Sequence, residues 1–418
     1  MVSIARKNLL EDIPRFLVAQ AGIMFAVTLV TLQTGIYNGF TRSTGQLVHN
    51  SEADIWVASE SLVQLELTLP IPLSNVIEAR KIAGVERAEA LIFSSALWRH
   101  PSGEITYVRV TGFDPNGQLF TPRNIKQGSV SALQEPYTVM VDTTNLNSLD
   151  IKGMGDAVKV NSLPARVVGL TQGNRSIVSN AFMFTSLVSA NAYLTSGQTS
   201  SVSCKLPSGS TELSCTNTYF RPPPTSTPIQ PSPLPNKLVA SDLITYVLIR
   251  AKPGQDLQVL KRQLEAALPN THAYTRAELI KKNQTFWQKR TGIGFLLSLG
   301  AVVGIIVGVI IVGQILYSSV SDHLKEFGTL KAMGASDWVI YGVIIEQALW
   351  MAVLGYIPSM ALCYAVVTWT FLTQGILILI TPGSAIAVFG LTVIMCVGSA
   401  IFAIQKVTRL DPAMVFKA

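Results

Sequence analysis

Residues Ile293–Tyr317, with the sequence IGFLLSLGAVVGIIVGVIIVGQILY, decide how this chain must fold. The run contains no charged side chain, and it is longer than the roughly 20 residues that a helix needs to cross a bilayer. Comparable apolar runs occur at Phe16–Tyr37, Val339–Leu372 and Ile386–Ile404. Over the whole chain 49% of residues are hydrophobic and 14% are charged, with a mean hydropathy of +0.38. This composition excludes an ordinary soluble domain and predicts an integral membrane protein with four transmembrane helices.

Basic residues indicate the orientation of these helices, because short cytoplasmic segments are enriched in lysine and arginine. They lie before the first run, between the second and third, and after the fourth: Arg6, Lys7, Arg15, Lys325, Lys331, Lys406, Arg409 and Lys417. We therefore expect both ends in the cytoplasm and a multi-pass protein of the cell inner membrane. A cleaved signal peptide is the alternative for the first run, but its length and the lack of a small-residue cleavage motif favour an uncleaved anchor.

The orientation divides the chain into cytoplasmic, membrane and exported parts. The exported domain, residues 38–290, lies between the first and second spans. The expected parts are a cytoplasmic segment 1–15, spans at 16–37, 291–317, 338–372 and 386–404, a cytoplasmic segment 318–337 and a cytoplasmic tail 405–418.

The two ends of the exported domain show the same alternation of strands and helices. Ser74 is placed to cap a helix that Gly84 ends, and Asp256 is placed to cap a second helix with leucines at helical spacing. The expected strands are 54–58, 87–99, 105–113, 243–251 and 271–274, and the expected helices are 73–82, 256–268 and 276–290. This order is that of a split βαβ fold, so we expect an α+β domain with a core at 38–113 and 241–290.

Residues 114–240 form an insertion of different composition. Short alternating runs at 137–141, 157–160 and 166–170 predict a β-rich subdomain. Residues 221–235 are rich in proline and favour an extended chain that cannot pair in a sheet. An exposed linker and a docking site for a partner are both compatible with that stretch.

The four cysteines divide by compartment. Cys363 and Cys396 fall within apolar runs, whereas Cys204 and Cys215 lie in the exported domain. An oxidising compartment allows the second pair to form a disulfide, and two free thiols are the alternative.

The chain lacks the motifs of the common catalytic sites. It contains no G-x-x-x-x-G-K-[ST] phosphate loop, no H-E-x-x-H, no C-x-x-C and no G-x-S-x-G. Its histidines are separated from one another and from cysteine, so no metal site is predicted. The net charge of +7 comes from scattered residues and predicts no nucleic-acid partner. We expect a non-catalytic subunit without a cofactor, so that any ATP hydrolysis takes place on a separate chain.

Gly300, Gly304 and Gly308 recur at every fourth position of the second span. This spacing leaves a groove into which another helix can pack closely, although glycine is also common in membrane helices generally. Either another span or a second copy of the chain could fill the groove.

The charged stretch Lys325-Glu-Phe-Gly-Thr-Leu-Lys-Ala-Met-Gly-Ala335 separates the second and third spans. Residues 322–333 have helical spacing, with Ser321 or Asp322 as the cap and Gly334 as the end. The apolar ridge consists of Leu324, Phe327, Leu330 and Met333. Such a helix could lie on the lipid surface, or it could insert into a groove of a cytoplasmic protein while its charges fix the register.

The same stretch resembles the motif of FtsX-like permeases of the MacB and LolC type, the membrane subunits of type VII ABC transporters. The ending Leu410-Asp-Pro-Ala-Met-Val-Phe-Lys417 is similar to the C-terminal signature of that family. The layout of one span, a large exported domain and three spans also matches. The N-terminal Ala5-Arg-Lys-Asn-Leu9 and the strand Ala53-Asp-Ile-Trp-Val57 look most like the DevC-type permeases of cyanobacteria.

The resemblance implies partners and a mechanism. Two permease copies would pair with two ABC ATPase subunits that bind ATP and Mg, and the helix between the second and third spans would rest on the ATPase. Movement would pass to the exported domain, a mechanism termed mechanotransmission, and a glycolipid or similar amphiphile would leave through a periplasmic adaptor and an outer-membrane channel. The implied ATPase-coupling residues are Lys325, Glu326, Phe327, Gly328, Leu330, Lys331 and Gly334.

Two other classes of function stay open at this point. An FtsX-like regulator of similar layout would transmit ATP hydrolysis to a cell-wall hydrolase and move no cargo. A membrane-anchored receptor or enzyme would need no ATPase. The β-rich insertion favours transport over regulation, while the proline-rich stretch departs from the efflux pattern and puts the adaptor contacts in doubt.

Overall fold

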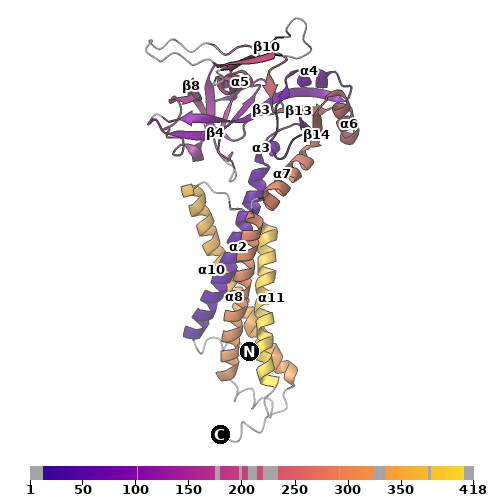
Figure 1. Cartoon of the computed structure of the whole chain (residues 1–418). Helices are drawn as coiled ribbons and strands as arrows, with labels where there is room; N and C mark the ends of the chain where they lie inside the picture. The colour runs from indigo at the N-terminus through magenta and orange to yellow at the C-terminus, as the bar shows by residue number, and fades with distance from the viewer. Residues whose placement is uncertain are drawn as a thin grey trace. The chain divides into compact units, whose positions relative to one another are not determined.

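The computed structural model describes residues 13–100, 102–174, 179–196, 200–205, 214–219, 234–290, 292–322, 329, 336–374 and 378–408. The chain separates into two compact units: residues 1–42 together with 287–418, and residues 43–286. The first unit is helical and the second contains all the described strands (Figure 1).

The helical unit contains four helices that are long and apolar enough to cross a membrane, which confirms that prediction. They are α2 (Ile13–Thr44), α8 (Ile293–Asp322), α10 (Asp337–Gln374) and α11 (Pro382–Thr408). Their facing side chains form one hydrophobic core, to which α2 contributes Ile23 and Val27, α8 contributes Leu316, and α11 contributes Met395.

The ends of two helices differ from the sequence-based boundaries. α8 continues to Asp322, so residues 318–322 extend the second span and do not begin a separate cytoplasmic helix. The Ser321 hydroxyl donates to the Tyr317 carbonyl oxygen at 2.9 Å, one turn earlier in α8, so Ser321 is not a helix N-cap. α11 begins at Pro382, before the expected Ile386, because proline is favoured in the first turn of a helix.

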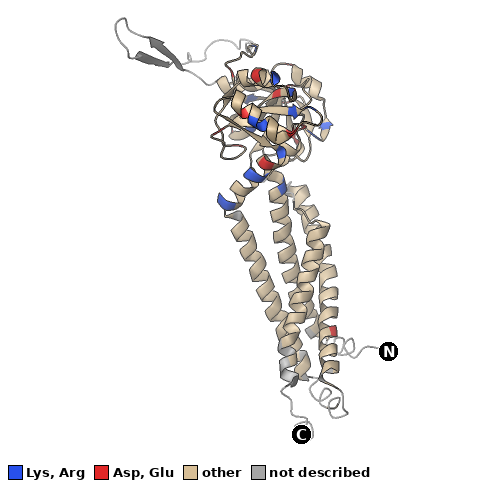
Figure 2. Ribbon diagram, turned by 90° about the vertical axis from the view of Figure 1, so that its right-hand side faces the viewer, with Lys and Arg blue, Asp and Glu red and all other residues tan. Residues whose placement is uncertain are grey.

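Charged residues are concentrated in the second unit and nearly absent from the described part of the bundle (Figure 2). Within the four candidate spans, Arg42 lies at the outer end of α2 and the half-buried Glu346 lies near the start of α10. This distribution fits helices that are surrounded by lipid over most of their length.

The first half of the exported domain is a four-stranded antiparallel sheet in the order β14-β1-β13-β3. Two helices connect its strands, which gives the expected split βαβ pattern. Its elements are β1 (Ile55–Ser59), α4 (Ser74–Arg80), β3 (Val85–Arg99), β13 (Tyr246–Ala251), α6 (Leu257–Ala267) and β14 (Thr271–Thr275). The predicted fold class is therefore confirmed.

The second half is a ring of strands that closes on β3, in the order β3-β4-β9-β6-β8-β7-β3. Its further strands are β4 (Ile105–Phe113), β6 (Thr138–Asp142), β7 (Ala157–Val160), β8 (Leu163–Thr171) and β9 (Ala181–Ser186). β4 was expected in the core at 38–113, but it pairs with β9 of the insertion. The insertion therefore begins, by strand pairing, before residue 114.

Strand β3 belongs to both halves. Its first part, to Leu91, pairs with β13, and its second part, from Ile92, pairs with β4. The sequence of a long strand does not show which partner each part takes.

Further helices, strands and turns complete the exported domain. They are α3 (Gln46–His49), β2 (Ile71–Pro72), β5 (Ile125–Gln127), the 3₁₀ turns Val130–Gln134 and Thr143–Asn145, α5 (Leu187–Thr195), β10 (Ser200–Lys205), β11 (Ser214–Tyr219), β12 (Leu243–Ile244) and α7 (Arg276–Arg290).

Of the two predicted helix caps in this domain, one is confirmed and one is wrong. The Asp256 carboxylate accepts hydrogen bonds from the backbone N–H groups of Gln258 and Val259, as an N-cap should. Ser74 lies inside α4, whose N-cap is Leu73 without a side-chain hydrogen bond. α4 also ends at Arg80, before the expected stop at Gly84.

A buried carboxylate fixes the turn that follows β4. Glu89 of β3 accepts hydrogen bonds from the backbone N–H groups of Gln118 and Leu119, at 2.9 and 3.0 Å. Arg87 forms an ion pair with the same carboxylate at 3.0 Å. A Cβ atom on Gly117 would lie 2.5 Å from Glu89 Oε2, so glycine is required for this approach.

Replacing Glu89 with alanine should destabilise the exported domain by about 2–3 kcal/mol, because the buried N–H of Leu119 loses its acceptor. The matched control is Glu86→Ala, since Glu86 is exposed on the same strand. Thermal unfolding of the purified full-length protein measures the difference, and equal stability of the two variants would contradict this role of Glu89.

Candidate functional site

The predicted ATPase-coupling residues Lys325, Glu326, Phe327, Gly328, Leu330, Lys331 and Gly334 lie outside the described residues. The structure does describe the helices on either side: α8 ends at Asp322 and α10 begins at Asp337. The role of these residues stays a prediction.

The three glycines of α8 lie where other helices of the same bundle come close. A Cβ atom on Gly300 would lie 2.5 Å from Gln33 Nε2, and one on Gly304 would lie 2.9 Å from Leu29 Cδ2, both on α2. A Cβ atom on Gly308 would lie 2.4 Å from Met395 Sδ of α11. At these positions the neighbour is thus a span of the same chain.

The interior of the bundle is closely packed where α2, α8 and α11 meet. The cavity that Val27, Ile305 and Val388 help to line has a volume of about 10 Å³, roughly enough for one water molecule. Ser399 of α11 donates to the Val309 carbonyl oxygen of α8 at 3.1 Å. This part of the bundle holds its helices together and offers no room for an amphiphile.

At the outer end of the helical unit, α2 contacts the last turn of α7. Gln288 Nε2 donates to Tyr37 Oη at 2.9 Å, and the rings of Phe40 and Trp287 meet edge to face with centroids 6.4 Å apart. Gly292 then separates α7 from α8 with φ of +64°, a conformation that glycine adopts without strain.

Within the exported domain, a capping box holds the first turn of α7. The Thr275 N–H donates to Glu278 Oε2 at 2.9 Å, and the Glu278 N–H donates to Thr275 Oγ1 at 3.3 Å. Lys261 of α6 forms an ion pair with the same carboxylate at 2.5 Å. Two hydrogen bonds from the Arg276 guanidinium to the Ala53 carbonyl oxygen, at 3.2 and 3.0 Å, tie this turn to the start of β1.

The pKa of Glu278 reports the balance of these contacts. Desolvation raises it, but the hydrogen bonds from Lys261, the Thr275 N–H and Gln258 outweigh that effect and lower the pKa to about 2. Because the folded-state pKa is depressed, the stabilisation is present above the unfolded value and is lost only as pH falls toward about 2. The anchor of α7 therefore stays charged over the physiological range.

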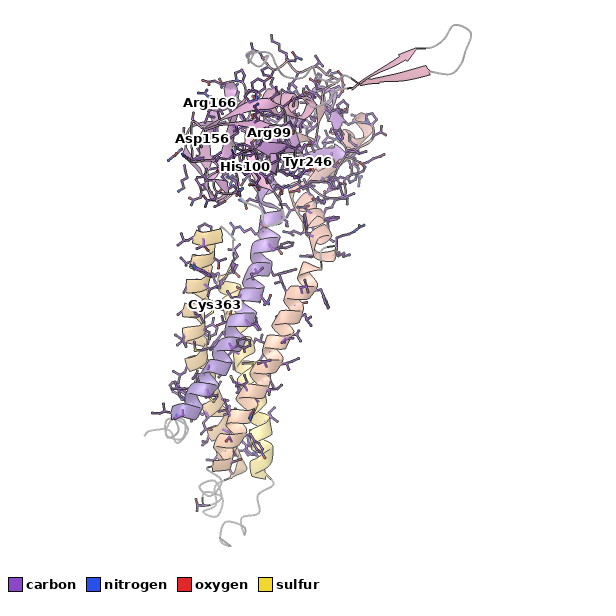
Figure 3. The ribbon with its side chains drawn as sticks, turned by 60° about the vertical axis from the view of Figure 1, so that its left-hand side comes forward. Arg99, His100, Asp156, Arg166, Tyr246 and Cys363 are labelled. Carbon is purple, nitrogen blue, oxygen red and sulfur yellow. The ribbon has the colours of Figure 1, made fainter. Side chains whose placement is uncertain are left out.

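Asn283 of α7 connects three segments at the base of the exported domain. The side chain is buried; its Nδ2 donates to the Thr44 carbonyl oxygen at 2.6 Å, and its Oδ1 accepts from the Leu65 N–H at 3.1 Å. The hydroxyl of the buried Tyr246 (Figure 3) donates to the Leu65 carbonyl oxygen at 2.6 Å. Burial raises the pKa of Tyr246, so its hydroxyl remains a donor.

The other connection, through α3, is held by the strand ring. Asn50, which follows α3, donates from Nδ2 to Asn174 Oδ1 at 2.9 Å, and the Asn174 N–H donates to Asp142 Oδ2 at 2.8 Å. Ser51 Oγ donates to the Leu119 carbonyl oxygen at 2.9 Å. The chain thus enters the exported domain at the ring and leaves it at the split βαβ sheet.

The described residues contain no group of three or more side chains that could hold a metal ion. His49 lies on α3, His100 follows β3 and His272 lies on β14, while His323 is outside the described residues. Cys363 on α10 (Figure 3) and Cys396 on α11 are buried free thiols.

The strands β10 and β11 place Cys204 and Cys215 directly opposite each other in the ladder. The disulfide itself stays a prediction, because this is a statement about the backbone register only.

The sequence analysis identified neither the capping box of α7 nor the role of Asn283. The Thr275-x-x-Glu278 capping box was readable from its spacing. Asn283 was not, because its partners are 239 and 218 residues away along the chain.

Two family models match the chain. The model for the MacB-like periplasmic core domain matches residues 16–267, and the model for the FtsX-like permease C-terminal region matches residues 298–412. With four candidate spans and a sheet domain between the first two, the protein is a multi-pass membrane permease. The chain belongs to the FtsX-like, MacB-type family of ABC transporter permeases.

Similar proteins are longer than this chain. A probable export ATP-binding/permease protein of Pseudomonas fluorescens is 21% identical, over 95% of this chain and 57% of that protein. A probable syringafactin export ATP-binding/permease protein of Pseudomonas syringae is 20% identical, over 95% of this chain and 56% of that protein. The macrolide export ATP-binding/permease protein MacB of Chromobacterium violaceum is 29% identical, over 34% of this chain and 23% of that protein. The chain thus spans about half the length of the first two relatives.

The solved structures that match this chain include the periplasmic region of MacB from Actinobacillus actinomycetemcomitans, with a TM-score of 0.34 at 10% identity over 56% of this chain and 94% of that chain. The extracellular domain of the ABC-type transporter YknZ from Gram-positive bacteria has a TM-score of 0.31 at 10% identity, over 49% of this chain and 90% of that chain.

Replacing Asn283 with leucine should loosen the base of the exported domain, because the Leu65 N–H and the Thr44 carbonyl oxygen lose their partner. The expected cost is about 1–3 kcal/mol, seen as faster hydrogen exchange at the Leu65 amide. Lys281→Leu is the matched control, since Lys281 is exposed on the same helix. Unchanged exchange at Leu65 in Asn283→Leu would show that this contact does not hold the segment.

Proposed function

We propose that the protein is the membrane subunit of an ATP-driven export system in the cell inner membrane, and that it couples hydrolysis by an ABC ATPase to movement of its exported domain. The family models cover both the exported domain and the helices around the charged segment. The names of two relatives describe export proteins that combine ATP-binding and permease functions, which favours an ATPase partner for this chain.

The observation that carries the proposal is that both helical connections of the exported domain are fixed to folded structure where they meet it. A helix passes on a displacement only if its end is held, and α7 is held at its first turn by Thr275, Glu278 and Lys261.

In this proposal the segment from Lys325 to Gly334 contacts the ATPase. Its apolar residues would insert into a groove of that partner, and Lys325, Glu326 and Lys331 would fix the register by complementary charge. ATP and Mg would be bound by the partner, and two permease copies would form a dimer with two ATPase subunits.

The cargo is proposed to be a glycolipid or another amphiphile that leaves through a periplasmic adaptor and an outer-membrane channel. The likeness to DevC-type permeases supports this part of the proposal, which goes beyond what the family assignment itself requires.

Replacing Glu326 with lysine, or Gly328 with tryptophan, should abolish co-purification with an ATPase while leaving the protein in the membrane. The first change reverses a charge in the docking segment, and the second adds bulk where the family motif has glycine. The measurement combines mass-spectrometric identification of a chain carrying a phosphate-binding loop with ATP hydrolysis by the purified complex. Glu60→Lys, an equal charge change at an exposed position of the exported domain, is the control. Normal ATPase binding and activity in both docking variants would contradict the proposal.

A further inference from the structure

The hairpin of β10 and β11 forms a sheet of its own. The two strands pair antiparallel over six consecutive positions, from Ser200 opposite Tyr219 to Lys205 opposite Ser214. Neither strand pairs with any other strand in the described part of the chain. The hairpin therefore draws no ladder hydrogen bonds from the ten-stranded sheet of the exported domain.

Such a hairpin needs additional stabilisation. An isolated pair of strands is marginally stable in water, because it cannot bury enough apolar surface. Here Val202 and Tyr219 are the only large apolar residues of the two strands, which otherwise consist of serine, threonine, asparagine, lysine and cysteine. Residues 206–213 join the strands and are longer than the roughly 2–5 residues of the tight hairpin loops that fix a register.

The register places Cys204 opposite Cys215. Directly opposed residues of an antiparallel pair have Cα atoms about 4.5 or 5.5 Å apart, depending on whether they share hydrogen bonds. A disulfide spans Cα separations of about 4.4–6.8 Å. Both kinds of pair fall within that range, so the register brings the two cysteines within reach of one bond without moving the strands.

We propose that Cys204 and Cys215 are oxidised to an intrachain disulfide that fixes the register of β10 and β11. The oxidant is a protein thiol–disulfide oxidoreductase of the exported compartment. The thiolate of one cysteine attacks the disulfide of that protein and forms a mixed disulfide, which the second cysteine then displaces. Two S–H bonds of the hairpin are replaced by one S–S bond, and the two electrons and two protons remain on the oxidoreductase as a dithiol.

This inference requires only that the domain is exported. It does not depend on coupling to an ATPase, so the two proposals can fail separately.

The test uses the full-length protein in intact cells. Acid quenching stops thiol exchange, and N-ethylmaleimide then labels every free thiol under denaturing conditions. Trypsin cleaves after Lys205, which lies between the two cysteines, so Cys204 and Cys215 leave on different peptides unless a disulfide joins them. Cys363 and Cys396, buried in the spans, are the internal reference for free thiols.

We expect one linked peptide pair that separates on reduction, with Cys363 and Cys396 labelled. In Cys204→Ser the pair should disappear and Cys215 should be labelled. In Cys204→Ser/Cys215→Ser, cleavage after Lys205 in the folded protein should become faster, whereas Cys363→Ser should leave it unchanged. Labelling of both Cys204 and Cys215 in the wild-type protein, or a link from either cysteine to another chain, would overturn the proposal.

Discussion

The lipid bilayer sets the main constraint on this protein, because inside it every backbone N–H and C=O group must find a partner within the protein. The chain meets that constraint with four helices and places all its described strands between the first and second of them. The exported domain is thus joined to the bundle by two connections, α2 with α3 on one side and α7 with α8 on the other. In the proposed mechanism, a displacement of the spans would reach the domain through these helices.

The two connections are fixed to different halves of the domain. Asn50 and Ser51 bind the side of the strand ring, while Glu278 and Arg276 bind α6 and the start of β1. The halves share strand β3, which pairs with β13 over its first part and with β4 over its second. Asn283 of α7 also donates to the Thr44 carbonyl oxygen at the end of α2, so the two connections are joined to each other as well as to the two halves.

The features that repeat along the chain could be predicted from sequence, and those that depend on distant contacts could not. Hydrophobic length indicated the spans, and local spacing indicated the split βαβ order, the Asp256 cap and the bounds of α7. Closure of the strand ring depends on partners of β3 far along the chain, and Asn283 depends on Thr44 and Leu65. Ser74 and Ser321 have the residue type of a helix cap, but the neighbouring backbone continues the helix through both positions.

The central claim is that ATP hydrolysis at the cytoplasmic face moves the exported domain. Spin labels at Lys252→Cys, an exposed position of that domain, would report the distance between two copies in the assembled complex by pulsed electron resonance, with Cys204, Cys215, Cys363 and Cys396 replaced by serine. The account predicts that the distance distribution shifts between ATP-bound and ADP-bound complexes, and that Glu326→Lys abolishes the shift. An unchanged distribution in a complex that hydrolyses ATP would contradict it.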